Sequence, residues 1–188
     1  MSLTATAALT AAAAPSVTAD ERASRLIDAG TAWTERVTAS PASAQLTYKV
    51  GGQGEGAVAS RISAGTHEFF VDEPAGLAGD DIAASPVEIA LGALISCQIV
   101  VYRLYAQNLG IEIDSITAQA EGDLDVHGLF GLDDSVRPGF SDVRLTINVT
   151  GPESDDRYEE LHRVVDAHCP VLDLFANATP VSVTLVAN

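Results

Sequence analysis

The feature that most constrains the fold of this chain is one long apolar segment with helix signals at both ends. It begins at Ser85-Pro86-Val87-Glu88, where a serine cap, a proline at the first helical position and a glutamate three residues after the cap form a capping box. Gly110 is a typical helix stop, so we expect a helix from Pro86 to Asn108, roughly 35 Å long at 1.5 Å per residue. Residues 89–102 are apolar on nearly every face, and such a helix must be covered on all sides. In a protein of this size, a sheet on one side and a second subunit on the other would cover it.

Alternating sequences on both sides of this helix predict strands. Before the helix we expect strands at 45–50, 57–62 and 67–71, with the glycine-rich run 51–56 as the turn between the first two. After the helix we expect two long strands, 111–126 and 140–151, joined by a glycine-rich loop. Ser154 opens a second helix that ends at His168-Cys169-Pro170, and 180–186 is a final strand. This order predicts an α+β domain with a mostly antiparallel sheet.

The N-terminal part, residues 1–43, is expected to stand apart from the domain of residues 44–188. Up to about Ala19 the chain is rich in alanine and threonine and is most simply a tail. Thr18 and Glu21 then have capping-box spacing, and apolar residues recur at helical intervals as far as Val37. We predict a short amphipathic helix that packs Trp33 on the main body.

Charge and composition exclude several classes of function. The 188 residues include 26 Asp and Glu against 10 Lys and Arg, a formal net charge of −16, whereas nucleic-acid and anionic-membrane binding need positive surface. No Lys or Arg precedes Arg22, which excludes a typical secretory or transit signal. The longest apolar run, 89–102, is shorter than the ~20 residues that span a bilayer. We therefore expect a cytoplasmic protein that binds neither nucleic acid nor membrane and keeps its two cysteines reduced.

The two cysteines are the residues most able to do chemistry, yet their positions alone leave two interpretations open. Cys97 lies about three turns into the long helix, too far from its N-terminus for the dipole to activate it. A small apolar residue in a buried helix is the simpler reading, because a reactive thiolate needs a nearby cation. Cys169 ends the second helix, which suits either a semi-exposed thiol or packing.

Other polar residues have simple structural explanations. The capping box accounts for Glu88, and a solvated turn accounts for Asp72 and Glu73. His67 and His127 have no metal-ligand spacing, His168 suits a helix C-terminus, and the chain has no phosphate loop, dinucleotide fingerprint or Ser-His-Asp signature. No cofactor or metal is expected.

Three segments in order resemble the OsmC/Ohr family, the osmotically inducible and organic-hydroperoxide-resistance proteins. They are His67-Glu68-Phe69-Phe70-Val71-Asp72-Glu73-Pro74, the stretch from Ser85-Pro86-Val87-Glu88 to Cys97, and His168-Cys169-Pro170-Val171 with Thr179-Pro180-Val181. The loop with His127-Gly128 and Arg137-Pro138-Gly139-Phe140 is also similar. The resemblance covers residues 44–188 and is to the OsmC-like branch with Pro-x-Glu before the first-cysteine helix.

The resemblance implies a two-layer fold, a mostly antiparallel sheet wrapped around the central apolar helix, in an intertwined homodimer with active sites near the subunit interface. Family members reduce hydroperoxides, preferably organic ones, with a thiol pair. Cys97 matches the peroxidatic position and Cys169 the resolving position, and a small dithiol or lipoyl-type reductant would reset the pair.

The sequence departs from the best-characterised branch at the residues that activate the first cysteine. That branch has an arginine in the first glycine-rich turn and a glutamate ten residues before the cysteine. Here the turn, 51–56, has no arginine, and Glu88 lies nine residues before Cys97. Arg61 on the following strand is our candidate for the missing cation. The alternatives are a non-catalytic dimer that binds a lipid-like molecule in an apolar interface pocket, and a stress-induced dimer with no small-molecule site.

Overall fold

The computed structural model describes residues 14–187, and its central element is the predicted long helix. Helix α2 spans Pro86–Leu109. The Ser85 side chain and the Glu88 backbone and side chain form the predicted capping box, and Gly110 ends the helix in the left-handed region at φ 62°. Both helix signals of the sequence are confirmed, because both are local interactions that need no tertiary partner.

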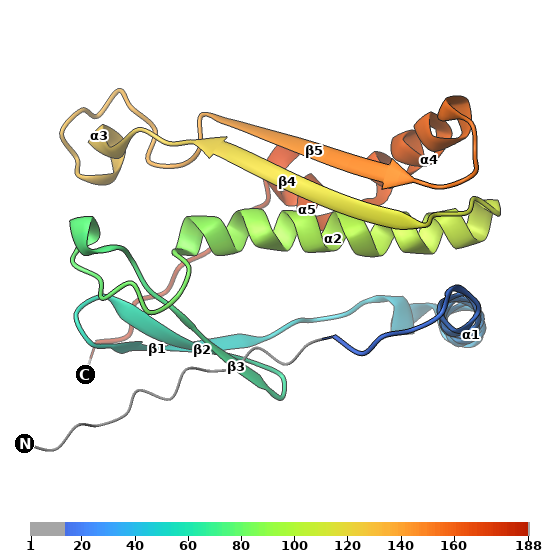
Figure 1. Ribbon diagram of the computed structural model, residues 1–188. Coiled ribbons are helices and arrows are strands. Elements are labelled where there is room, and N and C mark those ends of the chain that lie inside the picture. Colours follow the sequence, from blue (N-terminus) through green and yellow to red (C-terminus); the bar gives the residue numbers. More distant parts are fainter. Residues whose placement is uncertain (1–13, 188) are drawn as a thin grey trace, which may run out of the picture.

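Two antiparallel sheets lie on opposite sides of α2 (Figure 1). The first contains β1 (Val50–Glu55), β2 (Ala59–Ala64) and β3 (His67–Val71) in the order β1-β2-β3. The second pairs β4 (Ser115–Asp123) with β5 (Asp142–Thr150), and β4 packs on α2. Between β4 and β5 the chain forms a short helix, α3 (Val126–Leu129), where a loop was expected.

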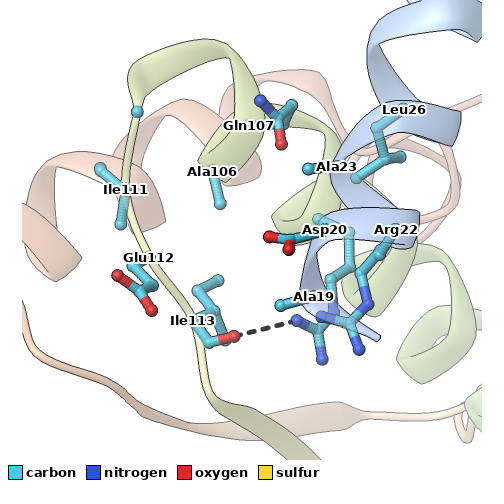
Figure 2. Close-up of a pocket in the computed structure, with 12 residues that line it drawn as sticks. Ala19, Asp20, Arg22, Ala23, Leu26, Ala106, Gln107, Ile111, Glu112 and Ile113 are labelled. Carbon is cyan, nitrogen blue, oxygen red and sulfur yellow. Dashed lines mark hydrogen bonds between the residues drawn. The ribbon is translucent and has the colours of Figure 1, made fainter. Parts of the chain in front are cut away.

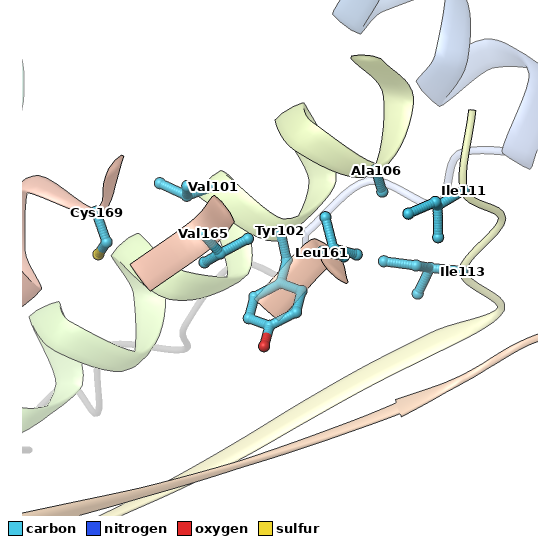
Figure 3. Close-up of a cluster of buried hydrophobic side chains, with 8 residues drawn as sticks. All are labelled: Val101, Tyr102, Ala106, Ile111, Ile113, Leu161, Val165 and Cys169. Atoms are coloured by element: carbon cyan, nitrogen blue, oxygen red, sulfur yellow. The ribbon is translucent and has the colours of Figure 1, made fainter. Parts of the chain in front are cut away.

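The core lies where α2 meets α4 (Asp155–His168) and α5 (Pro170–Ala176). Leu161 and Val165 of α4 are completely buried against one stripe of α2. Figure 3 shows this cluster, with Cys169 at one end of it. The buried members of the cluster are Val101, Tyr102, Ala106, Ile111, Ile113, Leu161, Val165 and Cys169.

The first sheet corrects the predicted position of its first strand. Strand β1 consists largely of the glycine-rich run, which was expected to be a turn, while residues 45–49 belong to no sheet. The turn is Gly56 to Val58, and Gly56 has a positive φ of 56°. Glycine is permissive rather than turn-forming by itself, so pairing with β2, with Gly52 opposite Ile62, decides the conformation.

The predicted second helix is confirmed, because α4 has Ser154 as its N-cap residue and ends at His168. The short helix α5, which begins at Pro170, was not predicted, although the fixed φ of proline suits a first helical position. The predicted final strand is wrong. Residues 180–186, predicted as a strand, belong to neither sheet within the part of the chain described here. Their apolar side chains are open to solvent, with Val183 91% and Leu185 89% exposed. A strand needs a partner, and among residues 14–187 this segment pairs with neither sheet.

The N-terminal helix α1 (Ala19–Ala39) begins at the predicted cap, where the Thr18 side chain accepts a hydrogen bond from the Glu21 N–H. It is longer than expected and buries none of its residues. Trp33 does not pack on the main body: it is 43% exposed and lies under the Arg36 guanidinium. The predicted tail up to residue 13 lies outside the described residues.

Helix α2 is longer than the apolar run that the sequence analysis considered. By length and composition it could cross a membrane, so the expectation that no segment reaches bilayer length is wrong. Its N-terminus carries Glu88 in the capping box, and one stripe of the helix is buried against α4 and α5. Length and apolarity by themselves are equally typical of the central helix of a globular fold.

Candidate functional site

The fold brings the two cysteines together. Cys97 lies on α2, half-buried at the border of the core cluster. Cys169 lies between α4 and α5, ending the first helix and preceding the second, and it is fully buried. The Cys169 thiol lies close enough to Cys97 to raise the pKa of the Cys97 thiol. Of the two readings left open for Cys169, the semi-exposed thiol is therefore not what the chain adopts.

The start of α5 supplies a further contact to Cys97. The backbone N–H of Val171 lies in the first turn of α5 and so has no acceptor within that helix. It lies close enough to the Cys97 sulfur to lower the pKa of the thiol. Proline at position 170 allows this helix to start directly after Cys169. Residues 169–171 therefore position the second cysteine and also bring the Val171 N–H close to the first.

Burial raises the pKa of the Cys97 thiol above its usual value. The N–H of Val171 lowers this pKa, and the neighbouring Cys169 thiol raises it. Within residues 14–187 no cation contributes to the environment of this sulfur. In a single chain Cys97 is therefore mainly the neutral thiol at neutral pH, and a positive charge supplied from elsewhere would be needed to make it a good nucleophile.

Glu88 lies in the first turn of α2, and Cys97 lies near the middle of the same helix. Nine residues separate the two, which is about 14 Å along the axis. One carboxylate oxygen, Oε2, accepts hydrogen bonds from the Ser85 hydroxyl at 2.7 Å and from the Ser85 N–H at 2.8 Å. These bonds hold the pKa of Glu88 below its usual value. In this chain the carboxylate serves the helix start.

Arg61 lies on β2, in the first sheet. Its guanidinium is 2.6 Å from the Glu55 carboxylate and lies over the Phe70 ring. The Arg61 side chain is half-exposed. Its charge does not contribute to the pKa of Cys97 in the same chain. The structure thus brings together two of the four proposed site residues, Cys97 and Cys169, and leaves Glu88 and Arg61 apart from them.

The loop after β3 is more ordered than a solvated turn. Asp72 is buried, and its Oδ2 accepts hydrogen bonds from the N–H groups of Asp80 and Ile82. Backbone N–H donors in this loop hold the pKa of Asp72 below its usual value. The interpretation of Asp72 as a solvated residue was wrong, because a buried carboxylate fastens the segment that leads into α2.

A cavity lined by both apolar and polar surface lies near the cysteine pair. It has a volume of about 480 Å³ and is formed by α2, β5 and α5. Leu94, one turn before Cys97, and Leu172, next to Val171, line its inner side, and Arg137 lies at its edge. Its other walls are Phe140, Ser141, Asp142, Val143, Leu145, Leu174, Phe175 and Ala176.

A second cavity, of about 650 Å³, lies between β5 and α4 and contains polar residues that the sequence analysis did not single out. The Tyr102 hydroxyl is 2.7 Å from His162 Nδ1, and His162 is 3.5 Å from Asp166. Burial, helped by Asp166, raises the pKa of Tyr102 to about 12. Gln98 is completely buried at this cavity, and both polar atoms of its amide lack a partner among the described residues. The sequence feature that could have identified these residues is the four-residue spacing of Gln98 and Tyr102, which places both on one face of α2.

The chain is similar in sequence and in fold to known proteins of one family. The sequence model of the OsmC-like proteins matches residues 79–184, more than half of the chain. No curated protein sequence matches the chain. Among solved structures, an OsmC-like protein from Mycoplasma pneumoniae superimposes with a TM-score of 0.61 at 16% identity, over 70% of this chain and 88% of its own.

Two further structures are organic hydroperoxide resistance proteins. The one from Legionella pneumophila has a TM-score of 0.54 at 18% identity, covering 70% of this chain and 90% of its own. The one from Elizabethkingia anophelis has a TM-score of 0.54 at 21% identity, covering 70% and 91%. At such identities these structures establish the fold. Together with the match over residues 79–184, they show that the chain belongs to the OsmC-like protein family.

Proposed function

We propose that this protein reduces organic hydroperoxides with the Cys97–Cys169 pair. The observation that carries the proposal is the direct contact of the two thiols at the junction of α2, α4 and α5. The chain has no other cysteines, and these two are 72 positions apart in the sequence. Packing alone does not require that two such residues meet in the fold. Structural relatives named as organic hydroperoxide resistance proteins support the same chemistry.

The proposed reaction uses the two thiols in turn. The Cys97 thiolate attacks one peroxide oxygen, the O–O bond breaks, and the other oxygen leaves as an alcohol after taking a proton. Cys97 is then a sulfenic acid. The Cys169 sulfur attacks it, a disulfide forms and water leaves. A small dithiol or lipoyl-type reductant restores both thiols by two exchange steps and becomes a disulfide itself.

The cation that this reaction needs is proposed to come from a homodimer. Among residues 14–187 no positive charge lowers the pKa of the Cys97 thiol. The sheet that carries Arg61 lies on the other side of α2 from the β4–β5 pair (Figure 1). If two chains exchange these sheets, Arg61 of one subunit faces the cysteines of the other. Glu88 at the start of α2 would orient that arginine.

The exposed apolar surface supports such a dimer. On α2, Val100 is 54% exposed, and Val87, Ile89 and Leu104 are exposed as well. The segment 180–186 alternates in the manner of a strand but has no neighbour among the described residues. The outer edges of β1 and β5 are also unpaired there. Open edges and an unpartnered strand complement one another, because backbone hydrogen bonds between chains would satisfy both.

The substrate class follows from the cavity next to the cysteines. Most of its lining residues have apolar side chains, although Arg137, Ser141 and Asp142 add polar surface, so it has room and apolar contacts for an alkyl or aryl hydroperoxide. We assign the reaction to the cytoplasm, where dithiols that can reduce the disulfide are maintained.

Consumption of cumene hydroperoxide with dihydrolipoamide tests the proposal. Wild type, Cys97→Ser and Cys169→Ser are compared, with Ser96→Ala as the matched control on the same helix. We expect both cysteine variants to lose turnover, and Cys97→Ser alone to lose the first reaction with peroxide. Mass spectrometry of peroxide-treated wild type should show a Cys97–Cys169 disulfide. Equal rates for wild type and Cys97→Ser would refute the assignment.

One observation favours a second candidate function, binding without catalysis. The pKa of the Cys97 thiol is raised rather than lowered in the single chain, and most residues that line the nearby cavity of about 480 Å³ have apolar side chains. A dimer that holds a lipid-like molecule there would show both features. Mass spectrometry of the native protein after mild purification distinguishes the two, since a binding protein would retain a ligand of defined mass in both wild type and Cys97→Ser.

A further inference from the structure

Two arginines face one cavity at the contact between the N-terminal helix and the domain. The cavity lies between α1 and the end of α2, with a volume of about 340 Å³. Arg22 comes from the first turns of α1 and Arg103 from α2, and both are half-buried. Figure 2 shows Arg22 on the α1 side, facing Ile113 across the cavity. The segment 110–113 and small residues of both helices form the remaining walls.

Neither guanidinium group has a carboxylate within ion-pair distance among the described residues, although Asp20 and Glu112 line the same cavity. Arg103 donates to the Ile113 carbonyl oxygen at 3.3 Å, which fixes its position without neutralising its charge. Among residues 14–187 neither arginine forms an ion pair with a carboxylate. Four of the other seven arginines have an acidic partner, among them Arg144 with Asp123 and Asp142.

The electrostatics of the cavity agree with this geometry. Burial and the positive charge of Arg22 lower the pKa of Arg103, so the two cations repel one another across the cavity. Holding like charges together costs free energy unless an anion lies between them. Guanidinium groups bind carboxylates and phosphates with two parallel hydrogen bonds, which makes an arginine pair a typical oxyanion site.

We propose that Arg22 and Arg103 bind one small oxyanion, a phosphate or carboxylate group, that joins the N-terminal helix to the domain. Asp20 and Glu112 line the same cavity. Their negative charges exclude polyanions and leave room for a single oxyanion group with a small body that carries hydroxyl or other donors. Helix α1 lies outside the region that matches the family, residues 79–184. The ligand would therefore couple the helix that precedes the family domain to the far end of the helix that carries Cys97.

Calorimetric titration of the full chain tests the proposal, with inorganic phosphate and propionate as separate probes in chloride buffer. Arg22→Gln and Arg103→Gln remove one cation each. Arg25→Gln is the matched control, because Arg25 lies on the same helix and pairs with Glu21 instead. We expect one probe to bind wild type and Arg25→Gln alike, and to bind each of the other two variants at least tenfold more weakly. Tighter phosphate binding identifies a phosphoryl ligand, and tighter propionate binding a carboxylate.

Thermal unfolding of Arg22→Gln provides a readout that does not depend on Arg103 and its structural hydrogen bond. In buffer without either oxyanion this variant should unfold at the same or a higher temperature than wild type, since it removes repulsion. It should also lose the stabilisation that the bound probe gives to wild type. Absence of binding by both probes, equal binding by Arg22→Gln and Arg25→Gln, or a lower unfolding temperature of Arg22→Gln in oxyanion-free buffer would each overturn the proposal.

Discussion

Replacing Gln98 by methionine should stabilise the protein. Gln98 is 0% exposed, and neither its amide nitrogen nor its amide oxygen has a hydrogen-bond partner among residues 14–187. Burying an unpaired amide costs about 1–3 kcal/mol in measurements on proteins. Methionine has nearly the same length and shape, and a substitution that conserves volume in a core costs less than about 1.5 kcal/mol. The expected net effect is a gain of about 1–2 kcal/mol in the free energy of unfolding.

Urea unfolding followed by circular dichroism measures this gain. For a chain of this size, 1 kcal/mol corresponds to a rise of roughly 2–4 °C in the melting temperature, which a thermal scan resolves. Gln119→Met on the exposed face of β4 is the control and should change the free energy of unfolding by no more than about 0.5 kcal/mol. A loss of 1 kcal/mol or more in Gln98→Met would refute the reasoning. It would show that the amide is hydrogen-bonded in the folded protein, to a buried water or to a second subunit.

Three further predictions concern the elements that position the site. Ser85→Ala removes the cap of α2 and should cost about 1 kcal/mol in urea unfolding, whereas Thr18→Ala at the cap of the peripheral α1 should leave the main transition unchanged. Gly110→Ala forces a side chain into the left-handed region at φ 62° and should cost about 1–2 kcal/mol by the same measurement; a neutral result would show that α2 ends differently. The pKa of Tyr102 is raised to about 12, so its neutral form stabilises the fold fully below pH 10. This contribution is lost as the pH rises from 10 through 12, which a comparison of wild type with Tyr102→Phe over that range would detect as a steeper loss of stability in wild type.

The sequence by itself determined the features that rest on local interactions. Ser85 with Glu88, Gly110, and Thr18 with Glu21 each mark a helix end through bonds within a few residues, and the structure confirms all three. The strand 67–71 was also found at its observed bounds, because its partner β2 is joined to it by a short turn and the pairing is therefore local in sequence. The α+β class follows from the order of such elements.

The tertiary structure decided what depends on distant partners. The glycine-rich run became β1 because β2 pairs with it, and the alternating segment 180–186 pairs with neither sheet among the described residues. Asp72 is buried and accepts hydrogen bonds from N–H groups eight and ten residues later in the chain. The order of residues in the sequence does not reveal these bonds.

The same division holds for the candidate site. The sequence names Cys97 and Cys169, but their contact arises from the packing of α4 and α5 on α2. A thiol is identified by its residue type, whereas its pKa depends on burial and on charges that tertiary and subunit contacts bring near it.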